Sequence, residues 1–140
     1  MYKKNRKDVC IYFYDPLDNG DPVTFWLGNG RVIGIELWEP AHQLEIEDKV
    51  TIDNAQNLYG RPDLVGWSRI YGPNHRAVVW LEDGAMADVD RYGRLVNLLF
   101  FTPVAEEEFE TLPWARNIED EPNLDSSWVD LGPRDPFDWE

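Results

Sequence analysis

Carboxylates are the side chains of this sequence best suited to chemistry, and one group of them is evenly spaced. Asp15, Asp18 and Asp21 follow at intervals of three in the segment DPLDNGDP. A calcium loop of the EF-hand type needs alternating ligands, a glycine at its sixth position and a glutamate at its twelfth. This segment has two prolines and a different spacing, which is typical of a turn. We therefore expect no metal site and no cofactor.

A single acid also interrupts an apolar segment. Glu36 lies in the middle of RVIGIELW. On a buried face, a carboxyl has a raised pKa and can serve as a general acid. Because Glu36 alternates with apolar neighbours, the other interpretation is that it faces water or pairs with an arginine such as Arg31 or Arg94. The residue pattern favours this second interpretation.

The nucleophiles and bases of the chain form no recognisable catalytic set. The two histidines, His42 and His75, are both in turn-like segments, and the serines lie outside any nucleophile-elbow pattern. Cys10 opens an apolar strand, where a thiol is usually inert. The only Gly-Asn-Gly segment lies between two strand-like runs, whereas phosphate loops lead into a helix. We expect no catalytic residue and no enzyme activity.

The elements that position these residues are mostly strands. β-branched and aromatic runs separated by turn residues predict strands at 9–14, 23–27, 31–38, 67–71, 76–82, 85–90 and 94–101. Gly28-Asn29-Gly30 and Asp83-Gly84 have the composition of tight hairpin turns. One short helix is expected over residues 52–60, capped by Thr51 or Asp53 and ended by Gly60.

Two of the strand segments resemble each other. GRVIGIELWEPA (30–41) and GRLVNLLFFTPV (93–104) align without a gap at an offset of 63, with three identical positions and six that are apolar in both. This favours an internal duplication into two β-meanders, although any strand between a Gly turn and a proline has a similar pattern. The segment LVNLLFF is apolar on both alternating faces, so it belongs at the centre of a sheet or at a subunit contact. The predicted fold is α+β and mostly antiparallel β: two meanders around one short helix, followed by an extended acidic C-terminal tail.

The stretch from Ile11 to Pro40 carries a family resemblance. Its YDP turn and GRVIGIE strand resemble small bacterial β-domains of unknown function with a YD…GxVVGIE pattern, some of which are encoded beside ribonuclease-like toxins. The resemblance implies a β-rich domain of antitoxin or immunity type. It supplies no catalytic residue.

Charge divides the chain into three parts. Residues 1–7 form a basic N-terminal arm. Together with the β-rich domain at 8–104 they hold eleven bases against fifteen acids, whereas residues 105–140 contain twelve acids against two arginines within a net charge of −14. No long basic face is available for phosphate neutralisation, so we expect no direct nucleic-acid binding. With no long apolar run and a lone cysteine, the chain is expected to be cytoplasmic, without a membrane contact.

The acidic tail is also rich in aromatic residues. Four aromatic side chains supply on the order of 15–25 kcal/mol when fully buried, whereas ordering 36 residues costs roughly 36–72 kcal/mol. We therefore expect the tail to dock on its own domain or on a basic protein partner. The residues expected to bind that partner are Trp114, Trp128, Phe137, Trp139, Glu106, Glu107, Glu108, Asp130, Asp135 and Asp138.

Protein binding or inhibition is the function that this sequence predicts first. The alternatives are an assembly subunit that associates with its own copies and, less favoured, a mimic of DNA. In an extended tail the acids are spaced about 10 Å apart, against one charge per about 1.7 Å of duplex, so mimicry would require folding to gather them. An enzyme ranks last.

Overall fold

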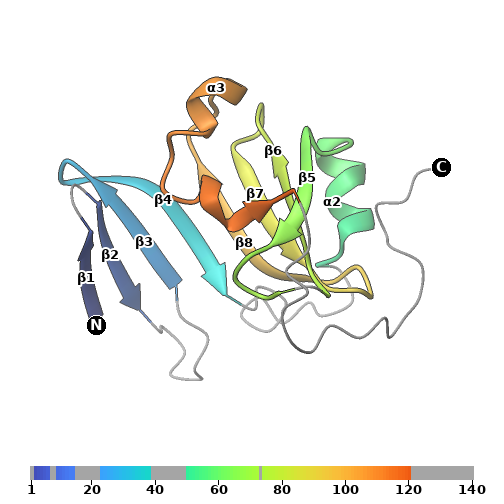
Figure 1. The fold of residues 1–140 in the computed structure, drawn as a ribbon, viewed down its shortest axis with the longest axis horizontal. Helices are drawn as coiled ribbons and strands as arrows, with labels where there is room; N and C mark the ends of the chain where they lie inside the picture. The colour runs from blue at the N-terminus through green and yellow to red at the C-terminus, as the bar shows by residue number, and fades with distance from the viewer. Residues whose placement is uncertain (1, 7–8, 15–22, 39–49, 73, 121–140) are drawn as a thin grey trace.

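The computed structural model describes residues 2–6, 9–14, 23–38, 50–72 and 74–120, and they form a mostly antiparallel β-sheet with a short helix (Figure 1). The described residues contain nine strands in the order β1-β2-β3-β4-β8-β7-β6-β5-β9. The sheet is curled, and β3 to β9 form a half-barrel. The strands are β1 (Tyr2–Arg6), β2 (Val9–Tyr14), β3 (Val23–Gly28), β4 (Arg31–Trp38), β5 (Leu64–Ser68), β6 (Arg76–Trp80), β7 (Ala85–Val89), β8 (Leu95–Phe101) and β9 (Ile118–Glu119).

The sheet contains two runs of four sequential antiparallel strands, which meet at β4 and β8. Within each run every strand pairs with the next one in the chain. The last strands of the two runs pair with each other, with Glu36 opposite Leu99 and Ile35 opposite Phe100. The expectation that LVNLLFF lies at the centre of a sheet is confirmed.

Positive backbone φ angles explain why glycine and asparagine occupy the turns. Asn29 (φ 52°) and Gly30 (φ 76°) form the two-residue turn between β3 and β4, as the Gly-Asn-Gly composition predicted. Gly84 (φ 61°) lies at the end of the β6–β7 turn, where an added Cβ would be 1.9 Å from the carbonyl oxygen of Phe101. Only glycine allows this turn to pack so closely against the chain after β8.

The helix is confirmed as α2 (Ile52–Tyr59), and Thr51 rather than Asp53 is its cap. The backbone N–H of Asn54 donates to Thr51 Oγ1 at 3.3 Å, and Gly60 follows the last turn with φ 84°. The helix packs on one face of β5 to β8 through Ile52, Ala55 and Tyr59. The ring of Tyr59 lies 5.5 Å from that of Trp80, so aromatic packing fixes the helix on the sheet.

The opposite face of the sheet is covered by residues 104–119. This covering segment contains α3 (Glu106–Phe109), the 3-10 turn η1 (Ala115–Asn117) and β9, which pairs with β5. Phe109 and Trp114 are each 1% exposed and belong to the hydrophobic core. The first part of the expected tail therefore packs on the domain.

Other element boundaries differ from the predicted ones, because a turn occupies residues whose composition is typical of a strand. The strand expected at 67–71 is β5 at 64–68, because residues 69–71 form a turn, which is closed by the N–H of Gly72 donating to the carbonyl of Ser68. Residues 2–6, expected as part of a basic arm, form β1 beside β2. The Asp15–Asp21 loop, His42 and residues 121–140 lie outside the described residues.

Candidate functional site

The central strands have two unlike faces, which we define by their side chains. The inner face, under the covering segment, carries Trp26, Glu36, Asp88, Asn97 and Leu99. The outer face, which α2 covers in part, carries the alternate residues, including Phe25, Ile35, Leu37, Leu98 and Phe100. Strand pleating separates the two sets, because successive side chains point to opposite faces.

Glu36 lies on the inner face and is 3% exposed. Its carboxylate accepts hydrogen bonds from Trp26 Nε1 at 3.0 Å and from Asn97 Nδ2 at 2.6 Å. Burial raises the pKa of Glu36, while these two donors oppose the rise by stabilising the charged form. The interpretation that Glu36 faces water or pairs with Arg31 or Arg94 is wrong, because its strand position points into the core.

Asp88 is the second buried acid of the inner face. It lies opposite Asn97 in the β7–β8 ladder. Burial raises the pKa of the Asp88 carboxyl to about 7, a hydrogen bond from Ser68 works against this rise, and the charge of Glu36 adds to it. Its Oδ1 atom is buried without a hydrogen-bond partner among the described residues. A neutral, protonated Asp88 therefore suits this environment better than a carboxylate.

These acids are not arranged to meet a substrate. Glu36 and Asp88 are each 3% exposed, so a reactant would have to enter the core to contact them. His75, the described histidine, stacks on Tyr71 with ring centroids 5.2 Å apart, and burial lowers its pKa. Among the described residues, no three His, Cys, Asp or Glu side chains gather in a group able to hold a metal ion. Within the described sheet, the buried polar side chains Glu36, Asp88 and Asn97 are therefore part of the packing of the inner face.

The outer face carries an apolar strip at the centre of the sheet. We name Phe25, Ile35, Leu37, Leu98 and Phe100 the outer strip. The paired residues Ile35 and Phe100 remain 39% and 37% exposed, and the other three are partly buried. Ala85 lies opposite Phe100 on β7 and is fully buried, because α2 covers that side of the sheet. The apolar surface of the outer strip therefore begins where the cover of α2 ends.

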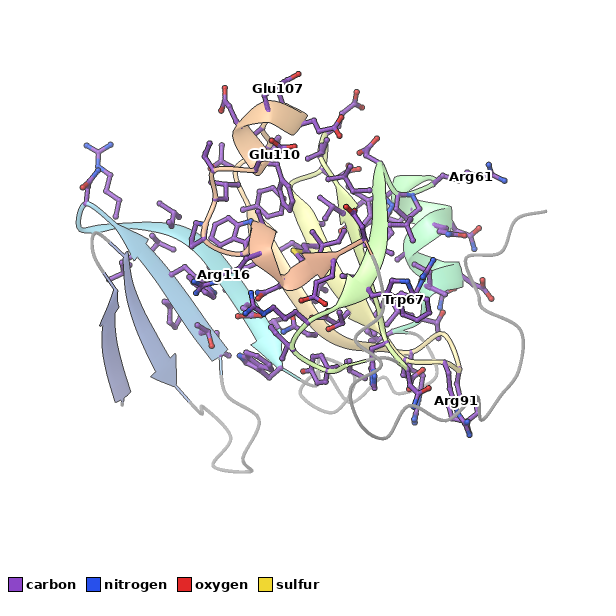
Figure 2. All side chains as sticks on the ribbon, viewed as in Figure 1. Arg61, Trp67, Arg91, Glu107, Glu110 and Arg116 are labelled. Atoms are coloured by element: carbon purple, nitrogen blue, oxygen red, sulfur yellow. The ribbon has the colours of Figure 1, made fainter. Side chains whose placement is uncertain are left out.

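An acidic end lies at one edge of the same sheet. Figure 2 shows Glu107 on α3 at the edge of the molecule, pointing away from the sheet, and Glu110 follows the helix directly. The β6–β7 turn packs against Phe101–Pro103, just before α3, and the N–H of Phe101 donates to the carbonyl of Gly84 at 2.8 Å. We define the acidic end by its six exposed carboxylates: Glu82, Asp83, Glu106, Glu107, Glu108 and Glu110.

The structure separates the residues that were expected to bind a partner. Glu106, Glu107 and Glu108 are exposed together on α3. Trp114 is buried instead, with its ring 5.6 Å from that of Trp26 and 5.4 Å from that of Phe101. It is unavailable to a partner because it holds the covering segment on the inner face. The remaining expected residues lie outside the described part of the chain: Trp128, Phe137, Trp139, Asp130, Asp135 and Asp138.

Sequence reasoning missed the outer strip as a surface. The signal was present, since LVNLLFF is apolar on both faces, but nothing in the sequence showed that α2 covers only half of the sheet. Comparison of the chain with protein-family models, with curated proteins and with solved structures finds no match in any of the three. No helix among the described residues has the length and apolar character needed to cross a membrane.

Proposed function

We propose that this protein is a non-enzymatic binding or inhibitory protein that engages a basic protein partner, in the manner of an antitoxin or immunity protein. The observation that carries the proposal is the outer strip, a partly exposed apolar surface on the central strands that no described segment fully covers. Water-exposed apolar patches on folded domains commonly mark interaction sites. Ile35 and Phe100 provide the flat apolar centre that a protein interface buries.

Charge indicates the kind of partner. Four carboxylates of the acidic end follow soon after β8, whose Phe100 belongs to the outer strip, and the other two lie in the β6–β7 turn that packs against the end of β8. Its six exposed carboxylates have no ion pair with any basic side chain among the described residues. Opposite charge on a partner accelerates encounter, whereas buried apolar contacts determine how long the complex lasts. A partner with an apolar centre and a basic rim fits both features.

The experiment uses affinity capture to obtain a candidate basic partner, followed by titration with the purified partner. The variant Ile35→Thr/Phe100→Thr keeps β-forming residues on the strands and should weaken the complex at least tenfold, chiefly through faster dissociation. Leu58→Gln is the matched control, because Leu58 is a 73% exposed apolar residue on α2 outside the strip. It should leave the affinity unchanged.

Charge is tested separately with Glu106→Gln/Glu107→Gln/Glu108→Gln, which should slow association and reduce its dependence on salt. Equal affinities for wild type, the strip variant and the Leu58→Gln control would contradict the proposal. So would the absence of any basic protein that binds with saturation. If the wild type instead forms dimers that Ile35→Thr/Phe100→Thr dissociates, the strip is a subunit contact and the assembly alternative replaces the proposal.

We also infer that the two four-strand runs arose by duplication, and the register of β4 and β8 supports this inference. The offset of 63 between the similar segments makes Glu36 equivalent to Leu99, and these two residues pair directly. The preceding hairpins carry register shifts at matching places, between Trp26 and Leu27 and between Asp88 and Val89. A pseudo-twofold axis through the Glu36–Leu99 pair accounts for this correspondence.

A further inference from the structure

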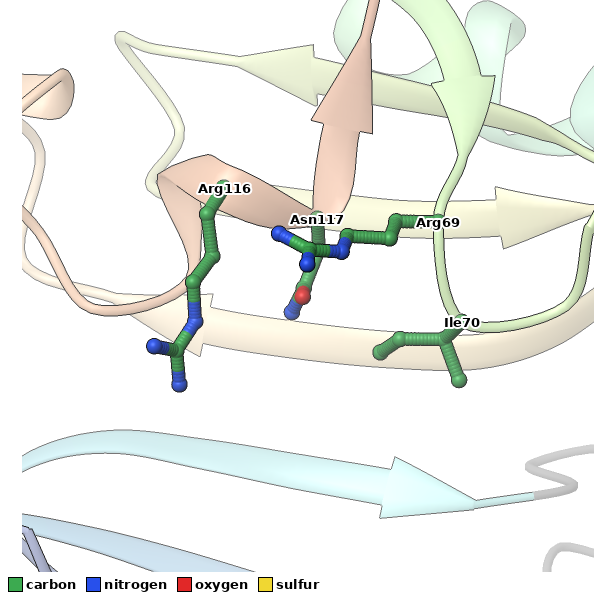
Figure 3. Close-up of a pocket in the computed structure, with 4 residues that line it drawn as sticks. All are labelled: Arg69, Ile70, Arg116 and Asn117. Atoms are coloured by element: carbon green, nitrogen blue, oxygen red, sulfur yellow. The ribbon is translucent and has the colours of Figure 1, made fainter. Parts of the chain in front are cut away.

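A small pocket lies beside the end of β5, where two arginines gather in an otherwise acidic chain. It has a volume of about 330 Å³ and is lined by Arg69, Ile70, Arg116 and Asn117. Figure 3 shows the Arg69 side chain extending over Asn117 toward Arg116, with Ile70 beside it. The volume is at the lower end of the roughly 300–1,000 Å³ typical of small-molecule sites.

Backbone hydrogen bonds hold the two sides of this pocket together. The N–H of Arg69 donates to the carbonyl of Asn117 at 2.9 Å, and Ser68 pairs with Ile118 in the β5–β9 ladder. Trp114, anchored in the core, fixes the chain just before Arg116. The backbone at both arginines is therefore positioned before any ligand arrives, which lowers the ordering cost of binding.

The charges of the two arginines are poorly compensated. Arg69 meets Glu119 only at a long Nε to Oε1 distance of 3.8 Å, and its side chain is 60% exposed. Arg116 is exposed and has no ion pair with a described acid. Guanidinium groups bind carboxylate and phosphate oxygens through paired N–H donors. Two such groups at one pocket, with the Asn117 amide between them, form a donor set suited to an oxyanion.

We propose that this pocket binds the carboxylate or phosphate group of a small-molecule ligand, with both guanidinium groups donating to its oxygens and Ile70 contacting its apolar part. Ile70 is 44% exposed and supplies an apolar surface at the pocket. This site is independent of the outer strip and of the protein partner proposed above. Glu119 competes with the ligand for Arg69. A bound oxyanion therefore replaces the long Arg69–Glu119 ion pair with closer contacts to the Arg69 guanidinium.

The test is an NMR titration of the full chain with inorganic phosphate in one arm and succinate in the other, at constant ionic strength. Saturable shifts at the pocket residues are expected in at least one arm, and the arm that saturates at the lower concentration distinguishes phosphate from carboxylate. Arg69→Gln and Arg116→Gln should each weaken binding at least fivefold. Arg31→Gln, which removes an exposed charge at the β3–β4 turn, should leave it unchanged.

Glu119→Gln gives a second and opposite readout, because removing the competing carboxylate should strengthen oxyanion binding by severalfold. Urea unfolding of each variant verifies that the fold is intact. Linear, non-saturating shifts in both arms would overturn the proposal. Equal weakening by Arg31→Gln would also overturn it, since the effect would then reflect net charge alone.

Discussion

The two faces of the central strands contrast sharply, although both are formed by alternate residues of the same two strands, β4 and β8. On the inner face, Glu36 and Leu99 are buried beneath the covering segment, which brings Trp114 onto the sheet. On the outer face, their neighbours Ile35 and Phe100 pair across the same strands and stay partly exposed. Among the described residues, the covering segment buries the inner face of these strands, whereas α2 covers the outer face only in part.

The difference shows what each face contributes. The inner face holds buried polar groups whose hydrogen bonds must be satisfied from within, as the Trp26 and Asn97 bonds to Glu36 illustrate. The outer strip consists of apolar side chains, which can exchange water for a partner without leaving polar groups unpaired. On β4 and β8, the inner face therefore contributes buried packing, whereas binding is proposed for the outer strip.

The largest expected effect comes from Gly84→Ala, which breaks the inner face at its edge. The added Cβ would be 1.9 Å from the carbonyl oxygen of Phe101, at a backbone φ of 61°. We expect a loss of more than about 4 kcal/mol in the free energy of unfolding, or failure to fold. Gly60→Ala is the control: its φ is also positive but an added Cβ meets nothing within 4 Å. Because its φ of 84° and ψ of −167° favour glycine, it should cost about 1–3 kcal/mol, less than Gly84→Ala. Similar costs for the two variants in urea unfolding would count against the close packing of this turn.

Trp114→Ala tests the covering segment directly. The side chain is 1% exposed and contacts the rings of Trp26 and Phe101. Its removal should cost about 3–5 kcal/mol, as for other large core aromatics, measured by urea unfolding. Amides of β9 should also exchange faster with solvent, because β9 follows the lost anchor. A cost below about 1 kcal/mol would mean that the covering segment is not part of the stable core.

Asp88→Asn tests the buried inner face through the pH dependence of the free energy of unfolding. Between the ordinary carboxyl pKa of 3.8 and the folded value of about 7, the folded protein keeps a proton that the unfolded chain has released. Stability from Asp88 is therefore present at low pH and is lost as the pH rises through this window. Asp88→Asn should be more stable than wild type at pH 8, by about 1–3 kcal/mol, with a smaller difference at pH 5. The same difference at both pH values would refute a protonated Asp88.

Local patterns were enough to predict much of the fold. Alternating apolar runs predicted β2, β3, β4 and β8, while Thr51 and Gly60 marked the ends of α2, because strand and helix signals act over a few residues. Docking of the tail on its own domain was one of two expected outcomes, but the choice between them could not be predicted, since the burial of Trp114 depends on Gly34, whose missing side chain leaves room for the indole ring. That contact spans eighty residues of sequence.

The candidate site was less predictable than the fold, because it depends on contacts between residues that are far apart in the sequence. The partner-binding role of Glu106, Glu107 and Glu108 stays a prediction, while Trp114 belongs to the core. Ile35 and Phe100 were hidden among apolar strand residues, because their exposure depends on how far α2 extends over the sheet. Arg69 and Arg116 line one pocket only because β9 pairs with β5.

The most direct test of the central claim is the cost of Ile35→Thr/Phe100→Thr in urea unfolding, set beside that of Trp114→Ala. If the outer strip is an open surface, the double variant should lose about 1 kcal/mol or less per substitution, well below the loss for Trp114→Ala. A loss as large as that of Trp114→Ala would contradict the account, because the strip would then be buried by the protein itself.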